Sequence, residues 1–225
     1  MIKKLEILGI TLNNDTVAEA MVLVEEFLGS TMMNTIEAIS MDTLVKTQED
    51  DRLKECIEQL DLAVVSDKEI LKAAGETSRQ RIQETVNNDF FKEFAKRASG
   101  NGRNVFLLGE TKEQLEALEE FLAENYSGIQ IAGRFGLADC TGDYDMVINE
   151  INIAEPDVIM SVLASPRQEY FLQDNREKLN AKIWYGLGEV YSDKKVVSEV
   201  AGFARKLIQK GVMHSMISRY KRKEE

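Results

Sequence analysis

Short apolar runs alternate with amphipathic helical patterns along the chain, and this alternation constrains the fold more than any other feature. Residues 62–65 are apolar throughout, and residues 104–109 and 158–163 are mostly apolar, as strands buried on both faces are. Each is followed by a stretch with apolar residues at helical spacing. We therefore expect an α/β fold, a Rossmann-like and mostly parallel sheet flanked by helices.

Weaker signals extend the same pattern to both ends of the chain. Residues 5–10, 35–39, 129–132 and 183–185 are further strand candidates, and residues 133–136 look like a loop. Thr16 with Glu19, and Thr111 with Gln114, have the spacing of capping boxes that start helices. We expect one α/β domain over residues 1–191 and a helical, basic C-terminal appendage over residues 192–225.

Open α/β sheets bind ligands at the carboxyl ends of their strands, so the residues that follow each strand are the candidate site. The segment at 155–169 is the most informative of these. Ser165 suits an N-cap, Pro166 the first helical position and Gln168 the position that closes a capping box. A helix start beside Arg167 suits a phosphate, diphosphate or carboxylate. The alternative is a plain helix cap with a solvated arginine.

The apolar run at 62–65 ends at Ser66-Asp67. A carboxylate there can act as a general base that takes a proton from an attacking hydroxyl. It can equally be the cap of the next helix. Gly109 suits close approach of a diphosphate, although Glu110 beside it is unfavourable, and Gly186 and Gly188 form a turn after the last strand.

The net charge of −11 argues against nucleic-acid binding, which needs a basic surface. Cys56 and Cys140 lie far apart, and His214 is the only histidine, so we expect neither a disulfide framework nor a metal site. The chain has no apolar run long enough to span a membrane and no signal-like N-terminus, which favours a cytoplasmic location.

Residues 205–225 carry seven basic and two acidic side chains, a net of +5 that leaves −16 for the rest of the chain. Apolar residues recur there at helical spacing, with cations beside them. Such a helix can contact an anionic membrane or dock on protein. The membrane-contact candidates are Met213, Met216, Ile217, Arg219, Lys221 and Arg222.

The order of these features resembles the WecG/TagA/CpsF family of bacterial glycosyltransferases. The strongest part is Pro156-Asp157 followed by Pro166-Arg167-Gln168-Glu169, which resembles the family's Pro-Asp strand that leads into Pro-Lys/Arg-Gln-Glu. A second part is the strand at 105–108 with Gly109. The resemblance covers nearly the whole chain.

The resemblance implies transfer of a sugar, such as N-acetylmannosamine, from a UDP-sugar to a polyprenyl-diphosphate-linked acceptor at the inner membrane face, with inversion and without a cofactor or metal. It implies that Asp67 is the catalytic aspartate, that Arg81 matches the family's arginine, and that Gln168 lies in the substrate-contacting motif. Ser165, Arg167, Glu169, Gly109, Gly186 and Gly188 complete the expected substrate site.

Several motif positions differ from the family pattern. The Asp-Gly pair is here Asp67-Lys68, the Thr-x-Asn strand end is Ala38-Ile39-Ser40, and the paired glycines are Gly109-Glu110. These changes remove hydrogen-bonding groups and add side chains where a ligand would approach the backbone. The alternative function is therefore a catalytically weakened relative that binds a nucleotide sugar or partners an active transferase. A homo-oligomer is compatible with either function.

Overall fold

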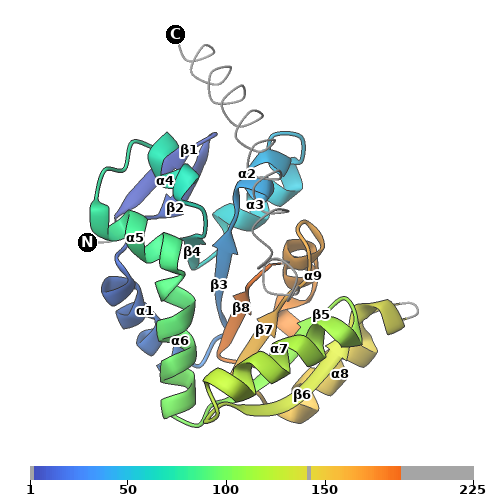
Figure 1. The fold of residues 1–225 in the computed structure, drawn as a ribbon. Helices are drawn as coiled ribbons and strands as arrows, with labels where there is room; N and C mark the ends of the chain where they lie inside the picture. The colour runs from blue at the N-terminus through green and yellow to red at the C-terminus, as the bar shows by residue number, and fades with distance from the viewer. Residues whose placement is uncertain (1–2, 141–142, 189–225) are drawn as a thin grey trace.

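The computed structural model describes residues 3–140 and 143–188, and within them the fold is a sheet of eight strands in the order β1-β2-β4-β3-β8-β7-β5-β6 (Figure 1). Apart from β1, all strands of this sheet are parallel to one another. β1 lies at one edge and pairs with β2 in the antiparallel direction. The predicted mostly parallel α/β fold is confirmed. The strands are β1 (Lys4–Ile7), β2 (Ile10–Asn13), β3 (Asn34–Ile39), β4 (Leu62–Val65), β5 (Asn104–Gly109), β6 (Gln130–Gly136), β7 (Val158–Ser161) and β8 (Ile183–Gly186).

Helices cover both faces of the sheet. One face is packed by α1, α6 and α7, and the other by α2, α3 and α4 at one end and by α8 and α9 at the other. The helices are α1 (Val17–Gly29), α2 (Met41–Lys46), α3 (Asp51–Glu58), α4 (Lys68–Ala73), α5 (Arg79–Asn87), α6 (Asp89–Gly100), α7 (Lys112–Asn125), α8 (Asp145–Ala154) and α9 (Arg167–Asn175). Two 3₁₀ turns lie at Leu137–Asp139 and Arg176–Lys178.

The central strands are apolar on both faces because both faces are covered. On β8, Tyr185 packs in the core beneath α1 and α6, whereas its neighbour Trp184 packs in the core beneath α8 and α9. Both side chains are buried, as the two-residue period of a doubly covered strand requires.

The two predicted capping boxes are present. Thr16 and Glu19 start α1, and Thr111 and Gln114 start α7, each with both reciprocal hydrogen bonds. Capping boxes can be predicted from the sequence because each depends only on residues within one helical turn.

The structure differs from the prediction at both edges of the sheet. Residues 5–10 are not one strand, because β1 and β2 form a hairpin whose turn residues Leu8 and Gly9 have φ of 53° and 71°. Residues 133–136 are not a loop but the second half of β6. Gly133 fits within this strand because its missing side chain makes room for the ring of Phe106.

The predicted cap at Ser165 is wrong. Pro166 is the N-cap of α9, and no side chain caps this helix. The backbone N–H of Gln168 donates to the carbonyl of Ala164 at 3.1 Å. The predicted appendage at 192–225 lies outside the described residues, so its boundary stays a prediction. In the described part of the chain, no helix is long and apolar enough to cross a membrane.

Candidate active site

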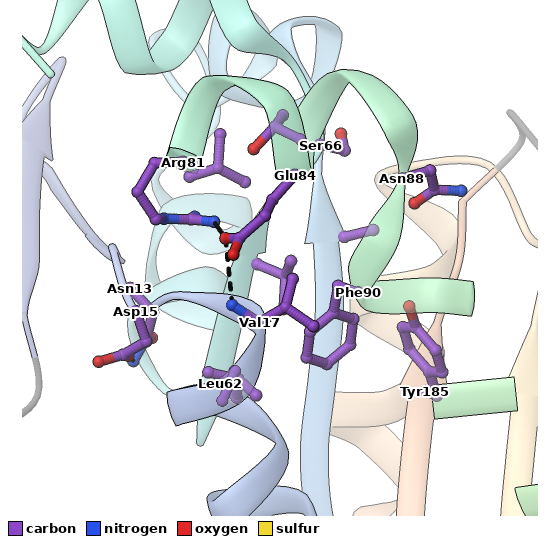
Figure 2. A pocket seen from close by; sticks show the side chains of 15 residues that line it. Asn13, Asp15, Val17, Leu62, Ser66, Arg81, Glu84, Asn88, Phe90 and Tyr185 are labelled. Atoms are coloured by element: carbon purple, nitrogen blue, oxygen red, sulfur yellow. Dashed lines mark hydrogen bonds and ion pairs between the residues drawn. The ribbon is translucent and has the colours of Figure 1, made fainter. Parts of the chain in front are cut away.

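The parallel strands end along one edge of the sheet, and this edge gathers most of the predicted site. Ile39 pairs with Val65, and Gly186 pairs with both Glu37 and Ser161. The segments that follow β3, β4, β7 and β8 are therefore neighbours. Arg81 comes from α5, which lies over the part of the edge formed by β2 and β4 (Figure 2).

Asp67 is held by the start of α2. Its Oδ2 accepts a hydrogen bond from the backbone N–H of Met41 at 2.7 Å, and its side chain makes no capping bond to α4. Asp67 is half-buried. The hydrogen bond from Met41 fixes the orientation of this carboxylate at the carboxyl ends of the strands.

The same short helix reaches the segment after β7. Lys46, at the end of α2, donates from Nζ to the carbonyl of Ser165 at 2.7 Å and pairs with Asp42 at 2.8 Å. α2 thus connects Asp67 at its start with Ser165 at its end. The Oγ of Ser165 is buried and makes no well-formed hydrogen bond.

Arg167 begins α9 and forms an ion pair with Glu110, which follows β5. Both side chains are partly exposed, at 40% and 37%. Arg167 places a positive charge at the start of α9, as predicted, and Glu110 partly neutralises that charge. Gly109 packs inward, because a Cβ there would lie 2.9 Å from Leu115 and 3.0 Å from Val162.

Gln168 and Glu169 both point into the protein. Gln168 is 3% exposed, and its Oε1 accepts a hydrogen bond from the N–H of Gly188 at 3.4 Å. A Cβ on Gly186 would lie 2.5 Å from Nε2 of Gln168 and 2.8 Å from Cγ of Glu37. The structure thus brings Gln168, Gly186 and Gly188 together, with the glutamine acting as a support for the turn after β8.

Two buried acids lie beside this glutamine. Burial, followed by repulsion from Glu169, raises the pKa of Glu37 well above its usual value, while the indole N–H of Trp184 donates to it at 3.2 Å. Burial likewise raises the pKa of Glu169. An ionised carboxylate is costly in such a place, so the pair favours its protonated form.

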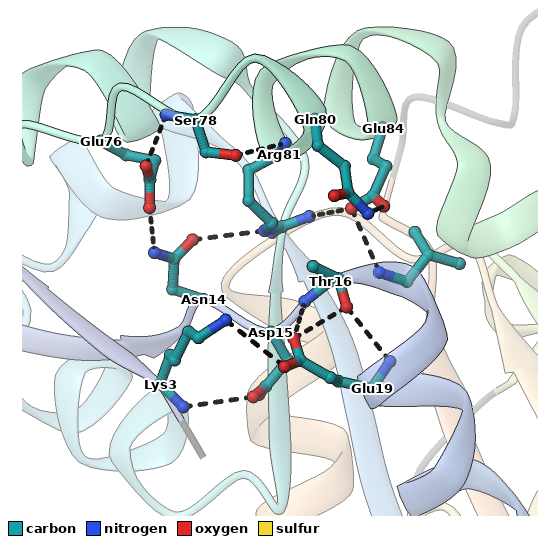
Figure 3. Close-up of polar contacts among 11 residues, drawn as sticks. Lys3, Asn14, Asp15, Thr16, Glu19, Glu76, Ser78, Gln80, Arg81 and Glu84 are labelled. Atoms are coloured by element: carbon teal, nitrogen blue, oxygen red, sulfur yellow. Dashed lines mark hydrogen bonds and ion pairs between the residues drawn. The ribbon is translucent and has the colours of Figure 1, made fainter. Parts of the chain in front are cut away.

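Arg81 is 7% exposed and already has partners (Figure 3). Its Nη1 lies 2.9 Å from Oε2 of Glu84, and its Nε donates to Asn14 at 3.3 Å. The same Glu84 oxygen accepts from the N–H of Val17 at 3.1 Å, at the start of α1. Glu84 therefore occupies a position that a ligand anion could otherwise take.

A cavity lies beneath α5, between that helix and the sheet (Figure 2). Its polar lining consists of Asn13, Asp15, Ser66, Arg81, Glu84, Thr85 and Asn88, and Phe90 and Tyr185 add aromatic rings. Amide, hydroxyl and carboxylate groups beside aromatic rings suit a ligand with several hydroxyl groups.

Three parts of this arrangement were not predicted from the sequence. Asn13 is the last residue of β2, and Asn14 and Asp15 follow it. These residues were missed because residues 5–10 looked like a single strand. Glu84 had no distinguishing signal. Glu37 had one, since it is an acid within the apolar run at 35–39.

Within residues 3–140 and 143–188, no group of three or more histidine, cysteine or acidic side chains is placed to hold a metal. The expectation of a metal-free site stays a prediction. The predicted membrane-contact residues, from Met213 to Arg222, lie outside the described residues.

Comparison with known proteins gives a family and several relatives. The chain is 24% identical to the N-acetylglucosaminyldiphosphoundecaprenol N-acetyl-beta-D-mannosaminyltransferase of Staphylococcus aureus strain MRSA252, over 85% of this chain and 77% of the relative. The protein of the same name from strain NCTC 8325 / PS 47 is 23% identical over the same shares. The sequence model of the glycosyl transferase WecG/TagA/CpsF family matches residues 5–194. The chain therefore belongs to the WecG/TagA/CpsF family of glycosyl transferases.

Proposed function

We propose that this protein transfers an N-acetylmannosamine-like sugar from a UDP-sugar to a polyprenyl-diphosphate-linked acceptor for cell-surface polysaccharide synthesis. Family membership and the relatives' names support transfer of a sugar. The observation that carries the catalytic part is the position of Asp67, fixed at the carboxyl end of β4 by the N–H of Met41.

In the proposed reaction, an acceptor hydroxyl attacks the anomeric carbon of the donor sugar from the face opposite the diphosphate. The new C–O bond forms as the bond to the UDP oxygen breaks, so the configuration inverts. Asp67 takes the proton of the attacking hydroxyl, and UDP leaves with the bond electrons. The start of α9 and Arg167 are the groups we assign to the departing diphosphate.

A second candidate function has a specific observation in its favour. Arg81 is paired with Glu84 and Arg167 with Glu110, so both candidate phosphate-binding cations are partly neutralised. A relative with this arrangement could bind a nucleotide sugar weakly and act as a partner of an active transferase.

Ligand-dependent stabilisation tests the donor site common to both functions. A ligand that binds the folded protein raises its melting temperature as its concentration exceeds Kd. We expect stabilisation by millimolar UDP and UDP-N-acetylmannosamine. If neither ligand shifts the transition, both functions are excluded. If they bind, turnover with lipid-linked N-acetylglucosamine acceptors supports the transferase, and its absence supports the partner role.

The proposed location at the inner membrane face depends on the basic tail. Truncation after Gly211 should reduce binding to vesicles that contain anionic lipid and leave binding to neutral vesicles unchanged. Equal binding by the full and truncated chains to anionic vesicles would leave the tail a role in protein docking instead.

A further inference from the structure

The segment at residues 75–88, which contains α5, is attached to the rest of the protein mainly by polar contacts. Arg81 is the only buried residue in the nine-residue helix α5. Ile82 is half-buried and packs against the apolar residues beneath α2 to α4. By contrast, α6 directly after it buries three phenylalanines in the core. A helix with so little buried apolar surface separates from a domain at much lower cost than one like α6.

The polar contacts of this segment converge on one short stretch, residues 14–17 (Figure 3). The side chain of Asn14 donates to Glu76 and accepts from Arg81 at 3.3 Å. The N–H of Val17 donates to Glu84 at 3.1 Å. The hydrogen bond from Asn14, followed by that from Ser78, lowers the pKa of Glu76, so this carboxylate is charged at neutral pH. We name the contacts from Asn14 and Val17 to the segment the clasp.

Both ends of the segment have left-handed backbone geometry. Gly75 has φ of 82° and no atom within 4 Å of the place where a Cβ would lie. Asn88 has φ of 57° and ends α5 as α6 begins, without a side-chain cap on α6. Such residues lie where the chain changes direction, and the segment between them can move as a unit.

The cavity beneath the segment is too small for a sugar in this arrangement. Its volume is about 30 Å³, and a single water requires about 10–15 Å³ on the same measure. Arg81, Glu84, Thr85 and Asn88 of the segment form part of its lining, together with Asp15 and Ser66 from the strand ends (Figure 2). A ligand of hexose size fits the cavity only if this lining moves.

We propose that residues 75–88 form a lid over the cavity, closed by the clasp to Asn14 and Val17, which opens at Gly75 and Asn88 to admit a sugar-sized ligand with several hydroxyl groups. The inference goes beyond the proposed function, because the movement belongs to the protein without ligand and can be measured in its absence.

Hydrogen exchange of the full chain tests the lid. We expect amides of α5 to exchange at least about tenfold faster than those of α6, through an opening that does not unfold the core. Asn14→Ala removes two contacts of the clasp and should increase α5 exchange further, with α6 unchanged. Asn125→Ala, which removes an exposed amide on α7, is the matched control and should change neither. If Asn14→Ala does not fold, Glu76→Gln weakens the clasp with less change of shape.

Cysteine labelling gives a second readout inside the cavity. Ser66 is half-buried with the lid closed, so Ser66→Cys in a Cys140→Ser background should react with a maleimide slowly and react faster when the lid opens. Peptide mass spectrometry separates position 66 from buried Cys56. Adding Asn14→Ala should raise the labelling rate by the same factor as the exchange of α5. Equal exchange of α5 and α6 in the unmodified protein, or labelling that Asn14→Ala leaves unchanged, would overturn the lid.

Discussion

Glu37 of β3 and Glu169 of α9 bring two acidic side chains together in the interior, where they are 0% and 3% exposed. One oxygen of each, Oε2, has no hydrogen-bond partner. No lysine or arginine of the described residues pairs with either acid. The two carboxyl groups also border a common cavity with Thr35 and Cys56.

This pair predicts a loss of stability at high pH. The folded pKa of Glu37 lies well above the usual 4.5, so folding binds a proton between 4.5 and the folded value. Its stabilising effect is complete below pH 4.5 and is lost as pH rises through the folded pKa, by at most about 1.4 kcal/mol per pH unit for one group. Glu37→Gln should remove this dependence, so its stability relative to the unmodified protein should increase from pH 5 to 9 in urea unfolding.

The control for this comparison is Glu150→Gln on the exposed face of α8. Measured over the same pH range, it gives the effect of the same amide replacement at the protein surface. A difference between Glu37→Gln and the unmodified protein that does not change with pH would mean that Glu37 titrates alike in the folded and unfolded chain.

Gly186→Ala should destabilise the turn after β8. The added methyl would lie 2.5 Å from Nε2 of Gln168 and 2.8 Å from Glu37, both themselves buried. Such overpacking costs about 1–3 kcal/mol. Gly29→Ala, where nothing lies within 4 Å, is the matched control and should be near neutral in denaturant unfolding. Equal midpoints for the two variants would show that Gln168 moves aside without cost.

Arg81 and Glu84 should be strongly coupled. Arg81→Met leaves Glu84, whose side chain is 13% exposed, without its cation, and the loss should be about 3 kcal/mol. The double variant Arg81→Met/Glu84→Met should recover part of this loss, because neither charge then remains unpaired. A double-mutant cycle in urea measures the coupling. If the losses of unfolding free energy in the two single variants simply add in the double variant, Arg81 and Glu84 do not stabilise each other.

Asp67→Asn should reduce kcat by about 10²–10⁴, the range for loss of a general base. The amide can still accept from the N–H of Met41, so the melting temperature should change little. Asp42→Asn, on α2 close by, removes an equal charge that pairs only with Lys46 among the described residues and should keep most activity. Undiminished turnover in Asp67→Asn would remove the assigned base.

Glu110→Gln should strengthen UDP binding about two- to fivefold, because Arg167 would no longer be shared with a carboxylate. Uridine, which has no phosphate, should bind the variant and the unmodified protein equally. Titration of both ligands at low salt measures the effect. An equal increase in affinity for UDP and uridine would show that the substitution acts on contacts to the nucleoside and not on contacts to the diphosphate.

The sequence predicted the central sheet well because its signals are local. The run at 62–65 and the run at 104–109 coincide with β4 and β5, and the capping boxes at Thr16 and Thr111 start the helices that they predict. The β1–β2 hairpin was missed because its turn uses Leu8, whose positive φ is stabilised by tertiary packing rather than by residue type.

The site was harder to predict, because the partners come from distant segments. The expectation that ligands bind after the carboxyl ends of strands identified Asp67 and Arg167. It did not predict that the N–H of Met41 holds Asp67 or that Glu110 pairs with Arg167. Whether Gln168 faces a ligand or the interior depends on Gly186, which is far from it in sequence. Such pairings follow from strand order, which no short motif specifies.

The position of β8 has a consequence for synthesis on the ribosome. Its four residues lie between β3 and β7, and among the described residues no other strand joins β1-β2-β4-β3 to β7-β5-β6. Both partial sheets therefore keep an open apolar edge until residue 186 has left the exit tunnel. Because pairing over such long sequence separations is slow, these edges are exposed to aggregation until β8 pairs with them.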